Sequence, residues 1–145
     1  MKANRLTDQL ASCWSAQHVF LYRLTAGLGP FDRNICILTV RGRKTGHEIS
    51  KPLWYYEREG RLHVIASYGG SDRPPAWYLN LAADPEVQVE IGWSRGRYRA
   101  RTLGDQEAKT LWPEILKRNL LYGCYQRMST RSIPIVELAP ERSQA

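Results

Sequence analysis

The sequence predicts one domain, mainly β with helices, in which six short strands form an antiparallel barrel. Three observations lead to this fold class. The chain has 145 residues, of which 43% are hydrophobic, so it can close one core but has no room for a second full domain. Apolar and polar residues alternate in six short segments, which is the period of β-strands. Six strands are too many for one open layer in so short a chain, which favours a small barrel.

The N-terminal segment predicts an amphipathic helix. Apolar side chains recur near helical spacing over residues 5–25, and Gly27 and Pro30 follow to end the helix. Its apolar stripe includes Trp14 and Phe20. We expect this stripe to fold against the barrel, although contact with a membrane surface would explain the same pattern.

The remaining elements follow in order along the chain. Strands are expected at residues 34–40, 49–57, 62–68, 86–92, 95–103 and 133–138. Glu59 and Gly60 provide the turn between the second and third strands, and a turn from Trp93 to Gly96 joins the fourth to the fifth. The single domain 1–145 thus divides into an N-terminal helix and linker (1–30), a barrel with inserted helices (31–140) and a tail (141–145).

Two further helices are expected between the strands, at residues 75–83 and 105–119. A residue that precedes proline is disfavoured in the helical conformation, so the first of these helices should begin at Pro75. Asp84 precedes another proline and should end it.

Composition limits the possible partners. Lys and Arg number 21 against 14 Asp and Glu, a net charge of +7, which favours anionic ligands. The three cysteines form no CxxC pair, and His18, His47 and His63 have no spacing that suggests a shared metal, so no metal site is expected. The sequence shows no signal-peptide core and no run long enough to span a bilayer, and we expect a cytoplasmic protein.

A basic hairpin is the first candidate site. Arg41, Arg43 and Lys44 lie in a turn closed by two glycines, and Thr45 adds a hydroxyl. Such a turn can hold a phosphate or a carboxylate. Charged turns are also commonly just solvated, so composition alone leaves both interpretations open.

A glycine pair precedes the helix expected at Pro75. Gly69 and Gly70 let the backbone approach a flat or bulky group, because neither has a Cβ atom. The positive end of the helix would face that edge. A tight strand-to-helix turn with no ligand fits the same residues.

A second basic cluster lies on one strand. Arg95, Arg97, Arg99 and Arg101 alternate with other residues and share one face. A nucleic-acid groove is one interpretation. A solvent-facing sheet is favoured, because glutamates on the preceding strand are placed to pair with these arginines.

Taken together, the motifs resemble those of the deazaflavin-dependent nitroreductase family, coenzyme F420-dependent reductases with a split β-barrel. The resemblance covers almost the whole chain. It rests on "GRKTG" at 42–46, "PLWY" at 52–55, "ASYGG" at 66–70, "PAWYLNL" at 75–81 and "YQRMSTRSIPIVEL" at 125–138. It implies a fold of the FMN-binding split-barrel type.

The resemblance also implies a site. The phosphate and glutamate tail of F420 would be held by basic groups at the barrel edge, and its ring would lie against the third strand's loop and the helix after it. The implied cofactor-binding residues are Arg43, Lys44, Thr45, Lys51, Pro52, Trp54, Ala66, Ser67, Tyr68, Gly69, Gly70, Ala76, Trp77, Tyr78 and Asn80.

Two positions depart from the family pattern. Tyr68 stands where the family commonly has a lysine, and Ile49 stands where it has an arginine. Lys51 lies on the same strand face as Ile49 and would partly replace the lost charge. Flavin mononucleotide therefore stays open as an alternative cofactor.

The resemblance implies hydride transfer from reduced F420 to a quinone-like or nitroaromatic acceptor. Tyr122, Tyr125 and Ser67 match the family residues near the ring and the acceptor, and one of them would donate a hydrogen bond to the acceptor oxygen. Without the motif match, the two tyrosines would be interpreted as core residues. A non-catalytic flavin or deazaflavin storage protein and a basic nucleic-acid or lipid binder remain as alternatives. Pairing of two copies through exposed aromatic residues is also expected to be possible.

Overall fold

The computed structural model describes residues 3–29 and 33–142, with side chains in the first helix from Cys13 onward. Pro30 and the last three residues of the predicted tail lie outside this part. The elements in chain order are α1 (Ala3–Thr25), β1 (Ile35–Arg41), β2 (Glu48–Arg58), β3 (Arg61–Ile65), the short 3₁₀ helix η1 (Tyr68–Gly70), α2 (Ala76–Ala83), β4 (Glu86–Ile91), β5 (Ser94–Thr102), α3 (Asp105–Arg118), α4 (Leu121–Met128) and β6 (Ile135–Pro140).

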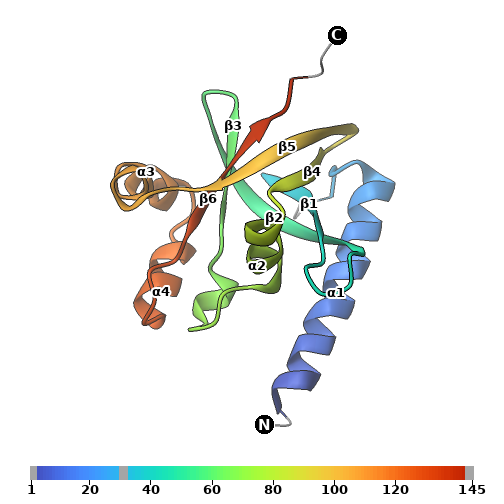
Figure 1. Cartoon of the computed structure of the whole chain (residues 1–145), viewed down its shortest axis with the longest axis horizontal. Coiled ribbons are helices and arrows are strands. Elements are labelled where there is room, and N and C mark those ends of the chain that lie inside the picture. The colour runs from blue at the N-terminus through green and yellow to red at the C-terminus, as the bar shows by residue number, and fades with distance from the viewer. Residues whose placement is uncertain (1–2, 30–32, 143–145) are drawn as a thin grey trace.

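The six strands close into one barrel, which confirms the predicted fold class. Their order is β1-β2-β3-β6-β5-β4, and every neighbouring pair is antiparallel. Figure 1 shows α1 along one side of the barrel, with α3 and α4 on the opposite side. The β1–β2 hairpin, α2, η1 and α4 lie toward the lower end, away from the β2–β3 and β4–β5 hairpins.

Two apolar clusters hold the barrel and its helices together. Inward-facing strand residues such as Leu38, Val64 and Leu138 form the barrel core with Trp77 of α2. A second cluster joins α3 and α4 to the outer face of the barrel, with Ile115 fully buried at its centre. Burial of such side chains contributes roughly 1.5–3 kcal/mol each to folding.

Helix α1 packs on the barrel as predicted. The Tyr22 hydroxyl donates a hydrogen bond to the Ile35 carbonyl at 2.9 Å and accepts one from the Gly92 backbone N–H at 2.9 Å. Arg23 forms an ion pair with Glu90 of β4 at 2.7 Å. Among the described residues, no helix is both long and apolar enough to cross a bilayer.

The arginine-bearing strand β5 faces β4 in the predicted register. Arg95, Arg97 and Arg99 lie opposite Glu90, Gln88 and Glu86. The actual partners differ from the simple cross-strand pairs, because Glu90 binds Arg23 and Arg95 donates to Gln88. Among the described residues no Glu–Arg ion pair joins β4 to β5, so the predicted cross-strand pairs are not formed. The β5 arginines are exposed, in line with the solvent-facing interpretation.

Four local predictions were wrong. The β4–β5 turn is the tight pair Gly92-Trp93, with φ of +60° at Gly92, so Gly96 lies inside β5 opposite Val89. The third strand ends at Ile65, before the predicted residue 68. Pro75 is extended, with ψ of 149°, and α2 begins at Ala76. Helix α4 was not predicted, because Gly123 and a run of polar and aromatic residues hide its helical period.

Candidate functional site

The basic hairpin between β1 and β2 is a closed turn. The Gly42 N–H donates to the His47 carbonyl at 2.8 Å, and the Gly46 N–H donates to the Gly42 carbonyl at 2.8 Å. Gly46 has φ of +73°, a conformation that glycine adopts without strain. Lys44 and Thr45 are exposed at its tip. The turn therefore presents a cation and a hydroxyl on a fixed backbone.

The hairpin is tethered to α2 by Arg43. Its backbone N–H and its Nη1 both donate to Oδ1 of Asn80, at 3.2 and 2.8 Å. Asn80 is only 3% exposed, so its side chain is placed to hold Arg43. Arg41 adds a looser ion pair of 3.6 Å with Asp84, the residue that ends α2. These contacts place the basic hairpin against the middle and the C-terminal end of α2.

Helix α2 offers few side chains to a ligand. Trp77 packs in the barrel core, Ala76 is exposed and Tyr78 is partly exposed. The Tyr78 hydroxyl lies 3.1 Å from Oγ1 of Thr102. The first turn of α2 begins after Pro75, so its unpaired backbone N–H groups give the helix a positive end there.

The loop after β3 turns in a left-handed conformation. Tyr68, Gly69 and Gly70 have φ of +45°, +62° and +82°. A non-glycine residue in this region costs of order 1–3 kcal/mol, so Tyr68 stores backbone strain. Ala66 and Ser67, just before the turn, are buried. A Cβ atom on Gly69 would meet nothing within 4 Å, so that position is open to an approaching group.

The predicted tyrosines lie in one aromatic group with Trp54 of β2. The ring centroids of Trp54 and Tyr122 are 5.4 Å apart, and those of Tyr122 and Tyr125 are 6.0 Å apart. Tyr122 is buried, and burial raises the pKa of its hydroxyl well above the usual value. Tyr122 therefore keeps its proton at neutral pH.

Lys51 and Pro52 of β2 lie next to each other but face opposite sides of the strand. Lys51 lies opposite Leu38, whose side chain is in the barrel core. Burial lowers the pKa of the Lys51 ammonium, and no carboxylate of the described residues forms an ion pair with it. An anion placed beside Lys51 would relieve this cost.

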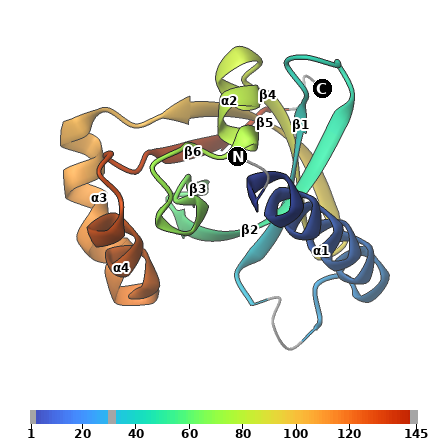
Figure 2. The same ribbon diagram turned by 90° about the horizontal axis from the view of Figure 1, so that it is seen from below.

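The predicted residues thus fall into two groups at the same end of the barrel. One is the hairpin with α2, and the other is the loop 66–70 with Trp54, Tyr122 and Tyr125. Seen from below, η1 lies between α4 and α2, with the hairpin beyond α2 (Figure 2). The sequence analysis did not identify three residues that tie the loop 66–73 to α4 and the turn after it: Asp72, Gln126 and Arg131. The one sequence feature that pointed to this tie was an arginine just before the last strand.

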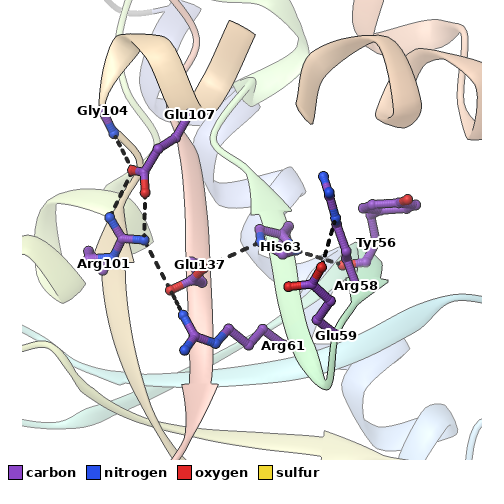
Figure 3. A network of polar contacts seen from close by, with 9 residues as sticks. All are labelled: Tyr56, Arg58, Glu59, Arg61, His63, Arg101, Gly104, Glu107 and Glu137. Carbon is purple, nitrogen blue, oxygen red and sulfur yellow. Dashed lines mark hydrogen bonds and ion pairs between the residues drawn. The ribbon is translucent and has the colours of Figure 1, made fainter. Parts of the chain in front are cut away.

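A separate polar network lies on another face of the molecule (Figure 3). Glu137 of β6 accepts hydrogen bonds from Arg61 at 3.0 Å and from Arg101 at 3.3 Å, and His63 Nε2 lies 3.7 Å away from it. Glu137, Arg61 and His63 line a cavity of about 330 Å³ beside α3. Burial lowers the pKa of His63, although Glu137 opposes this shift. The network contains none of the predicted site residues.

Comparisons with known proteins agree with the fold and the motifs. Residues 14–140 match the model of a family described as F420H(2)-dependent quinone reductase. A Mycobacterium tuberculosis protein named F420H(2)-dependent quinone reductase is 32% identical over 105 residues, which cover 70% of each chain. A solved F420-H2 dependent reductase shares 32% identity and a TM-score of 0.67, over 73% of this chain and 94% of that one. A solved domain-swapped dimer shares 27% identity and a TM-score of 0.69, over 95% of this chain and 99% of that one.

Proposed function

Because the chain belongs to the F420H(2)-dependent quinone reductase family, an oxidoreductase family that uses coenzyme F420, we propose that the two groups of residues at the lower end of the barrel form its reaction site. The reaction is transfer of a hydride from reduced F420 to a quinone. The observation that supports this site most directly is the contact of Arg43 with Asn80, which joins the basic hairpin to α2.

The donor set fits an anionic, planar cofactor. Lys44 and Thr45 at the hairpin tip, with Arg43 held in place by Asn80, would bind the phosphate and carboxylates of the tail. Lys51 would add a third cation beside Arg43 and Lys44, with its pKa raised toward the ordinary value by the anion. The open backbone at Gly69 would border the ring. When bound, F420 supplies the hydride; the protein supplies position and charge.

The tyrosines would act on the acceptor. Negative charge builds on a quinone oxygen as it is reduced, and a protonated hydroxyl nearby stabilises that charge. Tyr122 is protonated at neutral pH, as any tyrosine is, and burial raises its pKa further from that range. The Tyr125 ring lies against it. Ser67 is the third candidate donor, at the start of the left-handed turn. Trp54 packs against Tyr122. This contact would fix the Tyr122 ring and so orient its hydroxyl toward the acceptor.

Mixing purified protein with reduced F420 and menadione tests the function. We expect F420 to bind and its oxidation to depend on menadione. Binding without oxidation would support the storage alternative, and preferential binding of flavin mononucleotide in a parallel titration would overturn the cofactor assignment. A nitroaromatic compound in place of menadione tests the second acceptor class.

We also propose that α1 pairs two copies of the chain. The helix and the residues just after it expose four large apolar side chains, each 67–85% accessible: Trp14, Phe20, Leu24 and Leu28. One of the similar solved structures is a domain-swapped dimer. Light scattering should give twice the mass of one chain, and Leu24→Glu should reduce it to one. Flotation of a monomeric protein with anionic vesicles would instead favour membrane contact of the same face.

A further inference from the structure

The chain after α4 folds back on that helix and is fixed there by one side chain. Gln126 donates from Nε2 to the Arg131 carbonyl at 2.8 Å, and its Oε1 accepts from the Ile133 N–H at 2.9 Å. Both ends of the amide are used across the turn 129–132. Arg131 is therefore held at a fixed place beside α4.

The Arg131 guanidinium reaches from this turn into the loop after β3. Nε donates to the Ser71 carbonyl at 3.0 Å, and Nη2 lies within 2.9–3.2 Å of the carbonyls of Ala66, Ser67 and Arg73. Every one of these acceptors is a backbone oxygen of the loop. Only the planar fork of an arginine presents several donors at such fixed angles, and a lysine ammonium does not.

A second tie joins the same two segments. Oδ1 of Asp72 accepts hydrogen bonds from the backbone N–H and from the hydroxyl of Thr130, each at 2.8 Å. Close packing adds to it, because a Cβ atom on Gly70 would lie 3.0 Å from the Tyr125 carbonyl and 3.1 Å from Cβ of Met128. The loop and α4 therefore touch without a side chain between them at this point.

The tied loop is the strained one. The left-handed turn at Tyr68 persists only where the surrounding structure over-determines it. Arg131 binds the backbone on both sides of that turn, at Ala66 and Ser67 before it and at Ser71 and Arg73 after it. Ser67 lies on the loop, and Tyr125 lies on α4. Whatever fixes the loop to the helix also fixes the distance between these candidate donors.

We infer that Arg131 is a positioning residue, which locks the loop 66–73 to α4 so that the ring-facing backbone and the tyrosines keep one geometry. The inference rests on the proposed function for the identity of the site. It adds a residue that acts through the backbone it holds, by hydrogen bonds from Nε and Nη2.

Three variants test this. Arg131→Ala removes the guanidinium, and Arg131→Lys keeps the charge but loses the planar arrangement of donors. Arg127→Ala removes a charge from the exposed face of α4, where the guanidinium donates a hydrogen bond to Sγ of Cys124. Hydrogen exchange should speed up at the amides of Gly70 and Ser71 by about tenfold in the first, as expected when a local opening becomes easier by one buried hydrogen bond. Exchange in the strands and in Arg127→Ala should stay at the wild-type rate.

The dissociation constant for reduced F420 should rise about tenfold in Arg131→Ala, which corresponds to about 1.4 kcal/mol. Millimolar guanidinium chloride, far below denaturing concentrations, should restore both binding and slow exchange, which a general loss of stability would not allow. Wild-type binding and exchange in a folded Arg131→Ala protein would overturn the inference. So would faster exchange across all strands with no rescue.

The proposed function and the role of Arg131 can be tested separately. If wild-type protein does not bind F420, the proposed function is wrong. The hydrogen-exchange rates, with and without guanidinium, still show whether Arg131 fixes the loop. If Arg131→Ala does not fold, Arg131→Lys carries the same measurements, with a smaller expected increase in exchange. Wild-type exchange in Arg131→Lys would then overturn the inference.

Discussion

Asn80 of α2 accepts two hydrogen bonds from Arg43, one from the backbone and one from the guanidinium, through a single buried oxygen. One amide thus sets both the path of the hairpin and the direction of its arginine. The motif predicts that Asn80 contacts the cofactor. In the structure Asn80 holds Arg43, which we propose contacts the cofactor.

Replacing Asn80 tests that support. Asn80→Leu keeps the branched shape of the side chain and removes the acceptor, so Arg43 loses its anchor. We expect F420 binding to weaken about tenfold, with a loss of about 1–2 kcal/mol in unfolding free energy. Fluorescence titration and urea unfolding measure the two effects. The control is Asp84→Asn, which breaks only the exposed 3.6 Å ion pair with Arg41 and should change neither by a measurable amount. Equal effects of both variants would contradict this assignment.

Lys51 should show a conflict between stability and binding. Lys51→Met removes a half-buried ammonium whose pKa is lowered by burial, so the melting temperature should rise by about 2–4 °C. Binding of F420 should weaken, because the cation beside the tail is lost. Lys44→Met, at the exposed hairpin tip, is the matched control and should weaken binding without raising the melting temperature. If Lys51→Met raises the melting temperature but leaves the F420 dissociation constant unchanged, Lys51 does not contribute to cofactor binding.

The tyrosine hydroxyls should affect turnover more than binding. Tyr122→Phe with Tyr125→Phe keeps the rings packed on Trp54 and removes the proposed donors, so kcat should fall about 10²–10³-fold, the usual loss for such a donor. The F420 dissociation constant should change little. Stopped-flow oxidation of reduced F420 by menadione measures the rate. Unchanged turnover would show that both tyrosines are packing residues with no role as hydrogen-bond donors to the acceptor.

The buried His63 should make the fold acid-sensitive. Burial is the largest effect on its pKa and lowers it, against the opposing pull of Glu137 and the hydrogen bond to the Tyr56 carbonyl. A folded pKa below the unfolded value of about 6.5 means that stability is present above that pH and is lost as the pH falls through the folded pKa.

His63→Gln should therefore flatten the stability profile below pH 6.5, as measured by urea unfolding at several pH values. His47→Gln is the control, since His47 is exposed in the hairpin. If the unfolding free energy of His63→Gln still falls below pH 6.5 as in the wild type, other titrating groups cause the loss of stability.

The barrel could be predicted from the sequence because each strand carries its own signal. Alternating apolar residues fix a strand locally, and the glycine turns at Gly60 and Gly92 fix their partners. The position of the second turn was misread, because Gly96 also looked like a turn residue, and the third strand was predicted to end at residue 68 and not at Ile65.

The residues that join the site together could not be predicted in the same way. The acceptors of Arg131 are backbone carbonyls, which are the same in every sequence, so the arginine had no visible partner. Asn80 posed the opposite problem, because a polar residue in a motif suggests a ligand, and the structure gives its oxygen to Arg43. Motif order predicted the site residues, and three-dimensional contacts were needed to distinguish those that are open to a ligand from those that support their neighbours.

The place of β6 in the barrel also bears on how the chain folds during synthesis. Leu138 lies opposite both Leu62 of β3 and Ala100 of β5, so the last strand made is the one that closes the ring. Until it leaves the ribosome, β3 and β5 each expose an unpaired edge that invites pairing with another nascent chain. Chaperone protection would matter most in that interval, and slow translation of the codons for β6 would lengthen it.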